Sequence, residues 1–111
     1  MDWTDVFPGV PSDKLERGIE HFQKTATCVG EFHWNKQGTL LCTGTGSSRV
    51  GYAIRNGGCS WHFRDRSAIE LYRSMNGICR TSEVTIKFKF EDLPDYETIG
   101  RIIQMVLKAG T

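Results

Sequence analysis

The fold is decided by residues 49–64, which read RVGYAIRNGGCSWHFR. Apolar and polar side chains alternate on both sides of Asn56-Gly57, the strongest short signal for a two-residue β-hairpin loop. This loop puts the large apolar side chains of both strands on one face, whereas a three-residue loop that includes Gly58 would turn one strand over. We therefore predict the register of the shorter loop. Its apolar pairs are Val50 with Phe63, Tyr52 with Trp61 and Ile54 with Cys59.

A helix and a second hairpin are predicted upstream. Apolar residues recur at helical spacing over 13–25, and the period then changes to two. Gly38 can take the left-handed position that ends a three-residue hairpin loop. In that register Cys42 faces the core and Leu41 faces outward. The predicted pairs are Phe32 with Cys42 and Trp34 with Leu40.

A helix, a strand and a last helix are predicted downstream. Asp65 can cap the first helix, and Asn76-Gly77 can stop it. Residues 84–90 alternate as a strand, and Asp95 can cap a last helix that stops at Gly110. Hairpins followed by helices, without βαβ alternation, predict an α+β fold with an antiparallel sheet of about five strands and helices mainly on one face. The predicted order is α-β-β-β-β-α-β-α, in a single domain over 1–111 whose N-terminal arm, residues 1–11, packs on it.

Composition and charge narrow the functional classes. The chain has 111 residues, of which 39% are hydrophobic and 24% charged, as is usual for a globular domain. Lys and Arg number 14 and Asp and Glu 13, and the resulting net charge of +1 argues against a dedicated nucleic-acid binder. No apolar stretch approaches the ~20 residues that span a bilayer, and the first residues lack the pattern of a secretory signal. We therefore expect a cytoplasmic protein that binds neither nucleic acid nor membrane.

The four cysteines indicate buried positions and no metal or redox centre. Cys28, Cys42, Cys59 and Cys79 include no C-x-x-C pair, and three of them fall on predicted core faces. Cys59 and His62 point to opposite faces of one strand, so they do not form a catalytic pair. The sequence also contains no cofactor fingerprint. We expect no enzymatic activity, no bound metal and no cofactor.

The polar face of the predicted sheet carries the candidate binding residues. Arg49 lies across from Arg64, and two arginines directly opposite each other repel unless an anion or an acidic side chain lies between them. This pattern favours a shallow site for an anionic ligand, with an ordinary solvated face as the alternative. Lys87 and Lys89 share this face. The candidate ligand-binding residues are Arg49, Arg55, His62, Arg64 and His33.

The opposite, apolar face is rich in aromatic residues. The chain has 3 Trp, 3 Tyr and 6 Phe, which is enough to line a pocket or an association surface as well as a core. The candidate pocket-lining residues are Phe32, Trp34, Tyr52 and Trp61. A metal site formed by Glu31, His33 and His62 would need their strands to be neighbours, so none is predicted.

The last third of the chain combines a strand, an acidic turn with a proline and an amphipathic helix. Residues 84–88 read VTIKF, residues 91–95 read EDLPD, and apolar residues recur at helical spacing after them. This ending resembles that of the YdhG-like small bacterial domains, and the helix and strands over 13–64 are broadly consistent with them. Some of those domains are described as frataxin-like iron chaperones, so the resemblance implies iron handling as an alternative. The carboxylates suited to it are Asp13, Glu16 and Glu20, on one face of the first helix.

These patterns favour a non-catalytic binding or self-association module. The expected partner is another copy of the chain, another protein or a small anionic ligand, bound at the polar sheet face or in an aromatic-lined pocket. Two alternatives stay open. One is a frataxin-like iron-handling protein, and the other is a small accessory protein of a mobile element or phage that binds a host protein.

Overall fold

The computed structural model describes residues 3–26, 32–34, 41–55, 57–91 and 95–109. These residues form the α+β arrangement that the sequence predicts. The helices are α1 (Trp3–Val6), α2 (Ser12–Ala26), α3 (Ser67–Ser74) and α4 (Tyr96–Ala109), with a short 3-10 turn, η1 (Gly46–Ser48). The strands are β1 (His33–Trp34), β2 (Leu41–Thr43), β3 (Val50–Arg55), β4 (Gly58–Phe63), β5 (Arg80–Thr81) and β6 (Thr85–Lys89).

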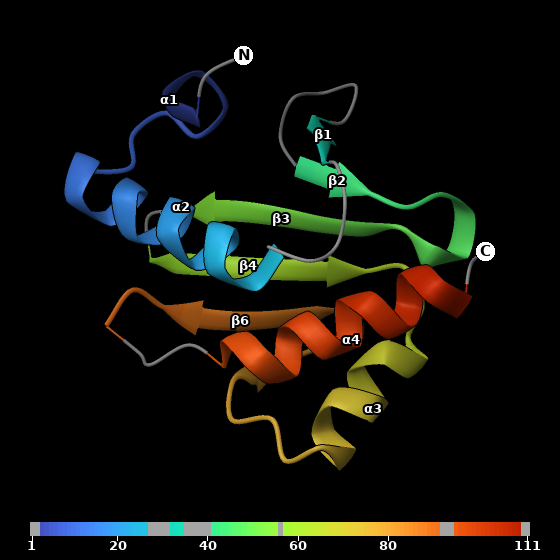
Figure 1. The fold of residues 1–111 in the computed structure, drawn as a ribbon. Helices are drawn as coiled ribbons and strands as arrows, with labels where there is room; N and C mark the ends of the chain where they lie inside the picture. The colour runs from blue at the N-terminus through green and yellow to red at the C-terminus, as the bar shows by residue number, and fades with distance from the viewer. Residues whose placement is uncertain (1–2, 27–31, 35–40, 56, 92–94, 110–111) are drawn as a thin grey trace.

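The described strands form one antiparallel sheet in the order β1-β2-β3-β4-β6-β5. Figure 1 shows α2 and α4 lying across one face of this sheet, with α3 beside α4. The β3–β4 hairpin is at its centre, and Tyr52 pairs with Trp61 as predicted. Arg55 pairs with Gly58, which confirms a connection of two residues. The expected fold class, with helices on one face of an antiparallel sheet, is confirmed.

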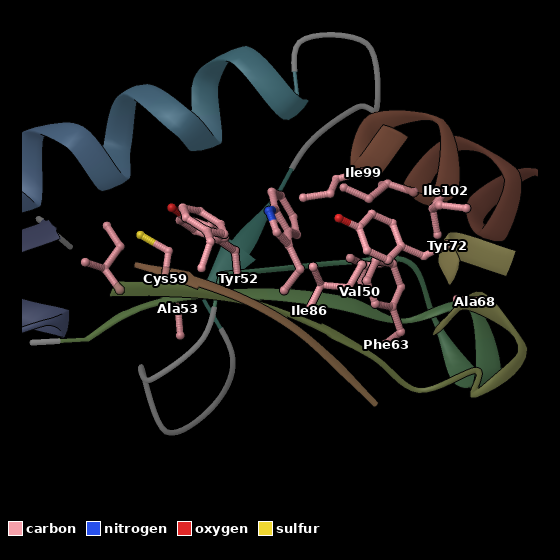
Figure 2. Packing of buried hydrophobic residues seen from close by; sticks show 14 of the residues in the cluster. Val50, Tyr52, Ala53, Cys59, Phe63, Ala68, Tyr72, Ile86, Ile99 and Ile102 are labelled. Carbon is pink, nitrogen blue, oxygen red and sulfur yellow. The ribbon is translucent and has the colours of Figure 1, made fainter. Parts of the chain in front are cut away.

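The core lies between the central hairpin and the helices (Figure 2). Tyr52 and Trp61 have no exposed surface. The Tyr52 hydroxyl donates a hydrogen bond to the carbonyl oxygen of Gly18 in α2 across 2.6 Å. A Cβ atom on Gly18 would lie 2.7 Å from Cδ1 of Ile54, so the glycine allows α2 to approach the sheet closely. At this point α2 can pack closely against the sheet because Gly18 has no side chain.

Both predicted signals at the ends of α3 are confirmed. The Asp65 carboxylate accepts hydrogen bonds from the backbone N–H of Ser67, across 3.0 Å, and from the Ser67 hydroxyl. This satisfies an N–H group that has no partner within the first turn. At the other end Asn76 has a φ of +60°, a conformation that asparagine tolerates better than most residues and that ends the helix.

The N-terminal arm packs on the sheet and on α2, as the sequence predicts. Phe7 is buried, and the Trp3 ring lies 5.5 Å from the Phe22 ring and 5.4 Å from the Trp34 ring. The arm was not expected to be helical, yet residues 3–6 form the single turn of α1. Aromatic contacts hold it against the edge of the domain where β1 lies.

The predicted register of the first hairpin is wrong by one residue in β2. His33 pairs with Cys42 and Trp34 with Leu41, whereas we predicted pairs of Phe32 with Cys42 and Trp34 with Leu40. Leu41 therefore faces the core opposite Tyr52, and Cys42 faces away from the helices. The larger apolar side chain takes the core position. Position 38, which led to the three-residue loop, lies outside the described residues.

The sheet also contains a short edge strand, β5, which has no counterpart in the prediction. It has two residues and pairs with β6 through Arg80↔Lys87 and Thr81↔Ile86. Three further predicted features, at Cys28, Pro94 and Gly110, lie outside the described residues. In the part of the chain that the structure describes, no helix is both long and apolar enough to cross a membrane.

Candidate functional site: a basic hollow on the open sheet face

The pairing of β3 with β4 decides which side chains face away from the helices. Tyr52 and Trp61 point into the core, so their neighbours Ala53, Ser60 and His62 point to the opposite face. Figure 2 shows Ala53 directed away from α2 and α4. We call this side of the sheet the open face. Cationic residues gather on it.

The open face contains a hollow of about 440 Å³ at the end of the sheet near the β3–β4 turn. Its described lining includes four cationic side chains and no carboxylate. This volume falls within the range of ligand pockets, about 300–1,000 Å³. We call it the basic hollow. Its lining residues are Arg55, Gly57, Gly58, Cys59, Ser60, His62, Arg80, Lys87, Phe88 and Lys89.

Cross-strand pairing brings these residues together from segments far apart in the sequence. Lys87 in β6 is paired with Ser60 on one side and with Arg80 on the other. In the next row, Gly58 is paired with both Lys89 and Arg55. Glycine is required there, because a Cβ atom on it would collide with the carbonyl oxygen of Phe88. The cations therefore surround a floor of small residues.

Among the described residues, no carboxylate forms an ion pair with Arg55, Arg80 or Lys87. All three side chains are exposed, and Arg80 and Lys87 lie directly opposite each other. Like charges in this position repel. The arrangement leaves local positive charge that a bound anion would neutralise.

His62 lines the basic hollow beside these cations. Its Nε2 atom shares a hydrogen bond with the Ser60 hydroxyl across 2.9 Å. Burial lowers the pKa of His62 below its ordinary value, and the positive charges of Arg55 and Lys87 lower it further. The ring can accept or donate a hydrogen bond, and its pKa depends on the charges of Arg55 and Lys87.

The structure divides the predicted ligand-binding residues between two places. Arg55 and His62 line the basic hollow. Arg49, Arg64 and His33 line another hollow of about 550 Å³ at the β1–β2 edge of the same face. As predicted, Arg49 and Arg64 are cross-strand neighbours, since the Arg64 N–H donates to the Arg49 carbonyl oxygen across 3.2 Å.

Three of the four cations that line the basic hollow were not among the candidates predicted from the sequence. Lys87 and Lys89 were placed on the right face, but their distance from Arg55 depends on β6 pairing with β4. The alternation over 84–90 indicated which face these two lysines share. It did not indicate which strand lies beside theirs. Arg80 gave no signal, because a two-residue strand has no measurable period.

The aromatic residues predicted to line a pocket belong to the packed core. Tyr52 and Trp61 are fully buried, and Phe32 and Trp34 are partly buried against the same cluster. Phe22 lies among them, with its ring 5.9 Å from the Trp61 ring and 4.8 Å from the Phe32 ring. Of the four candidates, Trp34 also lines the hollow at the β1–β2 edge.

The described residues contain no group of three or more His, Cys, Asp or Glu side chains placed to hold a metal ion. His33 and His62 are on β1 and β4, three strand spacings or about 14 Å apart, and Glu31 lies outside the described residues. On α2, the Glu20 carboxylate lies 2.8 Å from the Lys24 ammonium. A cation neighbour of this kind competes with a metal for the carboxylate.

Two cysteines occupy different faces of the sheet. Cys59 points into the core, and burial raises the pKa of its thiol to about 11. Cys42 lies on the open face, where the Arg49 guanidinium donates to its Sγ atom across 3.5 Å. The core face predicted for Cys42 is therefore wrong, as a consequence of the register of β2.

Comparison with models of protein families, with curated proteins and with solved structures finds no match to this chain. The resemblance to YdhG-like domains therefore stays a prediction.

Proposed function

We propose that this protein is a non-catalytic binding module that takes an anionic ligand, phosphate-bearing or carboxylate-bearing, into the basic hollow on its open sheet face. The observation that carries the proposal is the set of four cations, Arg55, Arg80, Lys87 and Lys89, around one hollow whose described lining has no carboxylate. Charged side chains that only stabilise a sheet are ordinarily of both signs, because opposite charges on neighbouring strands attract each other.

The chemistry of the hollow suits an oxyanion. Arginine presents a planar fork of donors that binds two oxygens of a phosphate or carboxylate at once, and lysine adds a compact charge. Arg55 and Arg80 stand on opposite sides of the paired strands β4 and β6, so an anion between them can be held from two directions. Ser60 and His62 add neutral hydrogen-bonding groups.

Inorganic pyrophosphate is a suitable probe, because it is compact, multiply charged and free of apolar groups that could bind elsewhere. We expect that titrating it into the ¹⁵N-labelled protein shifts the backbone amide signals of Ser60, His62 and Lys87. Sodium chloride at matched ionic strength should leave those signals in place, because the binding depends on a multivalent oxyanion rather than on screening.

Two variants separate a local site from general electrostatic attraction. Lys87→Gln removes one charge from the hollow and should weaken pyrophosphate binding at least about tenfold, the loss of one charge-assisted contact. Arg101→Gln removes one charge from an exposed position of α4, in the helical layer, and should leave binding unchanged. Equal effects of the two variants, or an absence of specific shifts, would refute the proposal.

A further inference from the structure

The basic hollow is one end of a longer basic surface. A third hollow of about 350 Å³ lies between it and the hollow at the β1–β2 edge and shares lining residues with both. His62 lines both the basic hollow and this connecting hollow, while Cys42, Arg49 and Arg64 line both the connecting hollow and the one at the β1–β2 edge. We call the three hollows together the basic trough.

Half of the cationic residues of the chain lie along this trough. Seven of the 14 lysines and arginines line it, whereas its described lining includes no aspartate or glutamate. The near-neutral net charge therefore conceals a strong separation of charge. Arg66 forms an ion pair with Glu83 at 3.7 Å, and both side chains are largely exposed. The seven cations are Arg49, Arg55, Arg64, Arg66, Arg80, Lys87 and Lys89.

The trough crosses the whole described sheet. Its lining begins at His33 in β1 and ends at Arg80 in β5, which are the two edge strands. Five strand spacings of ~4.8 Å make this distance about 24 Å. A small anion fills only one end of a surface of that length, so the trough fits a ligand with negative charges spaced along it.

We propose that the basic trough binds a single strand of nucleic acid through its phosphates. The inference rests on the proposed function, since the basic hollow would hold one or two of those phosphates. A sheet face offers only side chains to a ligand, because its backbone hydrogen bonds lie in the plane of the sheet. A nucleic-acid strand carries a charge at every unit of its backbone and can be held by side chains alone.

An acidic peptide fits this face less well. Its backbone N–H and C=O groups would find no backbone partners there, and extended peptides are usually recognised at sheet edges for that reason. Five of the seven cations are arginines, the residue best suited to phosphate oxygens. Gly51 and Gly58 lie in the floor of the trough and let a strand approach the sheet closely.

The mode of binding follows from what lines the trough. Phe63 and Phe88 belong to its lining, but both are buried in the core and offer no ring face on which a base could stack. Recognition would therefore depend on phosphates, tolerate different sequences and weaken steeply with salt. The net charge of +1 led to the expectation that the protein does not bind nucleic acid. Net charge is a sum over the whole chain, however, and does not show where the charges lie.

The test compares the two ends of the trough. Binding of a fluorescein-labelled oligothymidylate of about 20 nucleotides is measured by anisotropy over a range of salt concentrations. Combining Arg49→Gln with Arg64→Gln should weaken oligonucleotide binding at least about tenfold at ~0.05 M salt and reduce the salt slope by about 1.4, for two lost phosphate contacts. Pyrophosphate binding should stay unchanged, because those residues lie outside the basic hollow.

A matched control combines Arg17→Gln with Arg101→Gln, which removes two exposed charges from the helices and should leave the oligonucleotide affinity unchanged. An oligonucleotide affinity that is insensitive to Arg49 and Arg64, while pyrophosphate still binds, would overturn this inference alone. A lack of pyrophosphate binding would overturn the proposed function as well. If polyglutamate of equal length competes as strongly as unlabelled oligothymidylate, the ligand is an acidic protein segment and the nucleic-acid assignment is wrong.

Discussion

Arg80 lies directly opposite Lys87 in the β5–β6 pair, with both side chains exposed on the open face. Two like charges in this cross-strand position destabilise a sheet. On its other side Lys87 is paired with Ser60, whose side chain carries no charge. The pair is thus unfavourable for stability and favourable for holding an anion. This conflict is typical of binding sites.

Reversing one of these charges should separate stability from binding. In Lys87→Glu, the new carboxylate faces Arg80 and replaces a repulsion by an attraction. We expect the free energy of unfolding to rise by roughly 0.2–1 kcal/mol at low salt, as measured by urea denaturation. Pyrophosphate binding should be lost in the same variant.

The matched control for that change is Arg101→Glu on α4, which alters the net charge equally at an exposed position outside the hollow. It should leave pyrophosphate binding intact. A Lys87→Glu variant that is less stable than the parent and still binds pyrophosphate would show that the cationic pair has a structural role.

The buried His21 makes the stability of the fold depend on pH. The Trp61 indole N–H donates to Nε2 of His21 across 3.0 Å, and the ring is only 2% exposed. Burial lowers the pKa of His21 from 6.5 to about 3. The unfolded chain therefore takes up a proton near pH 6.5 that the folded chain refuses, so stability is retained above pH 6.5 and falls as the pH drops toward 3. The loss should reach about 3 kcal/mol at pH 4.

The His21→Gln variant isolates this contribution. Glutamine keeps an acceptor for the Trp61 N–H but does not titrate. Urea denaturation at pH 7 and pH 4 should therefore show a smaller loss of stability in the variant than in the parent, while His33→Gln, at an exposed position, should behave like the parent. Identical losses in the parent and in His21→Gln would show that protonation of other groups causes the acid sensitivity.

Gly58 and its neighbour Gly57 should respond differently to alanine. A Cβ atom on Gly58 would collide with the Phe88 carbonyl oxygen and lie 2.9 Å from the Lys89 Cα atom, both in the backbone of β6. Gly58→Ala should therefore reduce the free energy of unfolding by at least about 1–3 kcal/mol. A Cβ atom on Gly57 would meet nothing within 4 Å, so Gly57→Ala should stay within about 0.5 kcal/mol of the parent. Thermal or urea denaturation of the two variants measures the difference.

The central part of the fold could be predicted because local and global signals agree there. The Asn56-Gly57 turn and burial of the apolar face select the same β3–β4 register, and the structure has it. In the first hairpin the signals conflict. The turn at Gly38 favoured a short loop that would place Cys42 on the core face, whereas the structure places the larger Leu41 there, opposite Tyr52.

The candidate site could be predicted only in part. Alternation placed Arg55, His62 and Lys87 on one face, because a strand fixes the side to which each residue points. Their proximity depends on β6 pairing with β4, which joins segments about 25 residues apart and leaves no local mark in the sequence. Arg80 adds a cation from an edge strand too short to recognise. Sequence alone therefore indicated a basic face but not the hollow within it.

The pKa of His62, measured by NMR with and without sulfate, tests most directly whether the basic hollow binds an oxyanion. Sulfate is doubly charged and does not titrate near neutral pH, so it adds negative charge without a proton of its own. A sulfate ion between Arg55 and Lys87 would offset the two charges that lower the pKa of His62. We predict that sulfate raises this pKa relative to sodium chloride at the same ionic strength. An unchanged His62 pKa at saturating sulfate would contradict an anion site in the basic hollow.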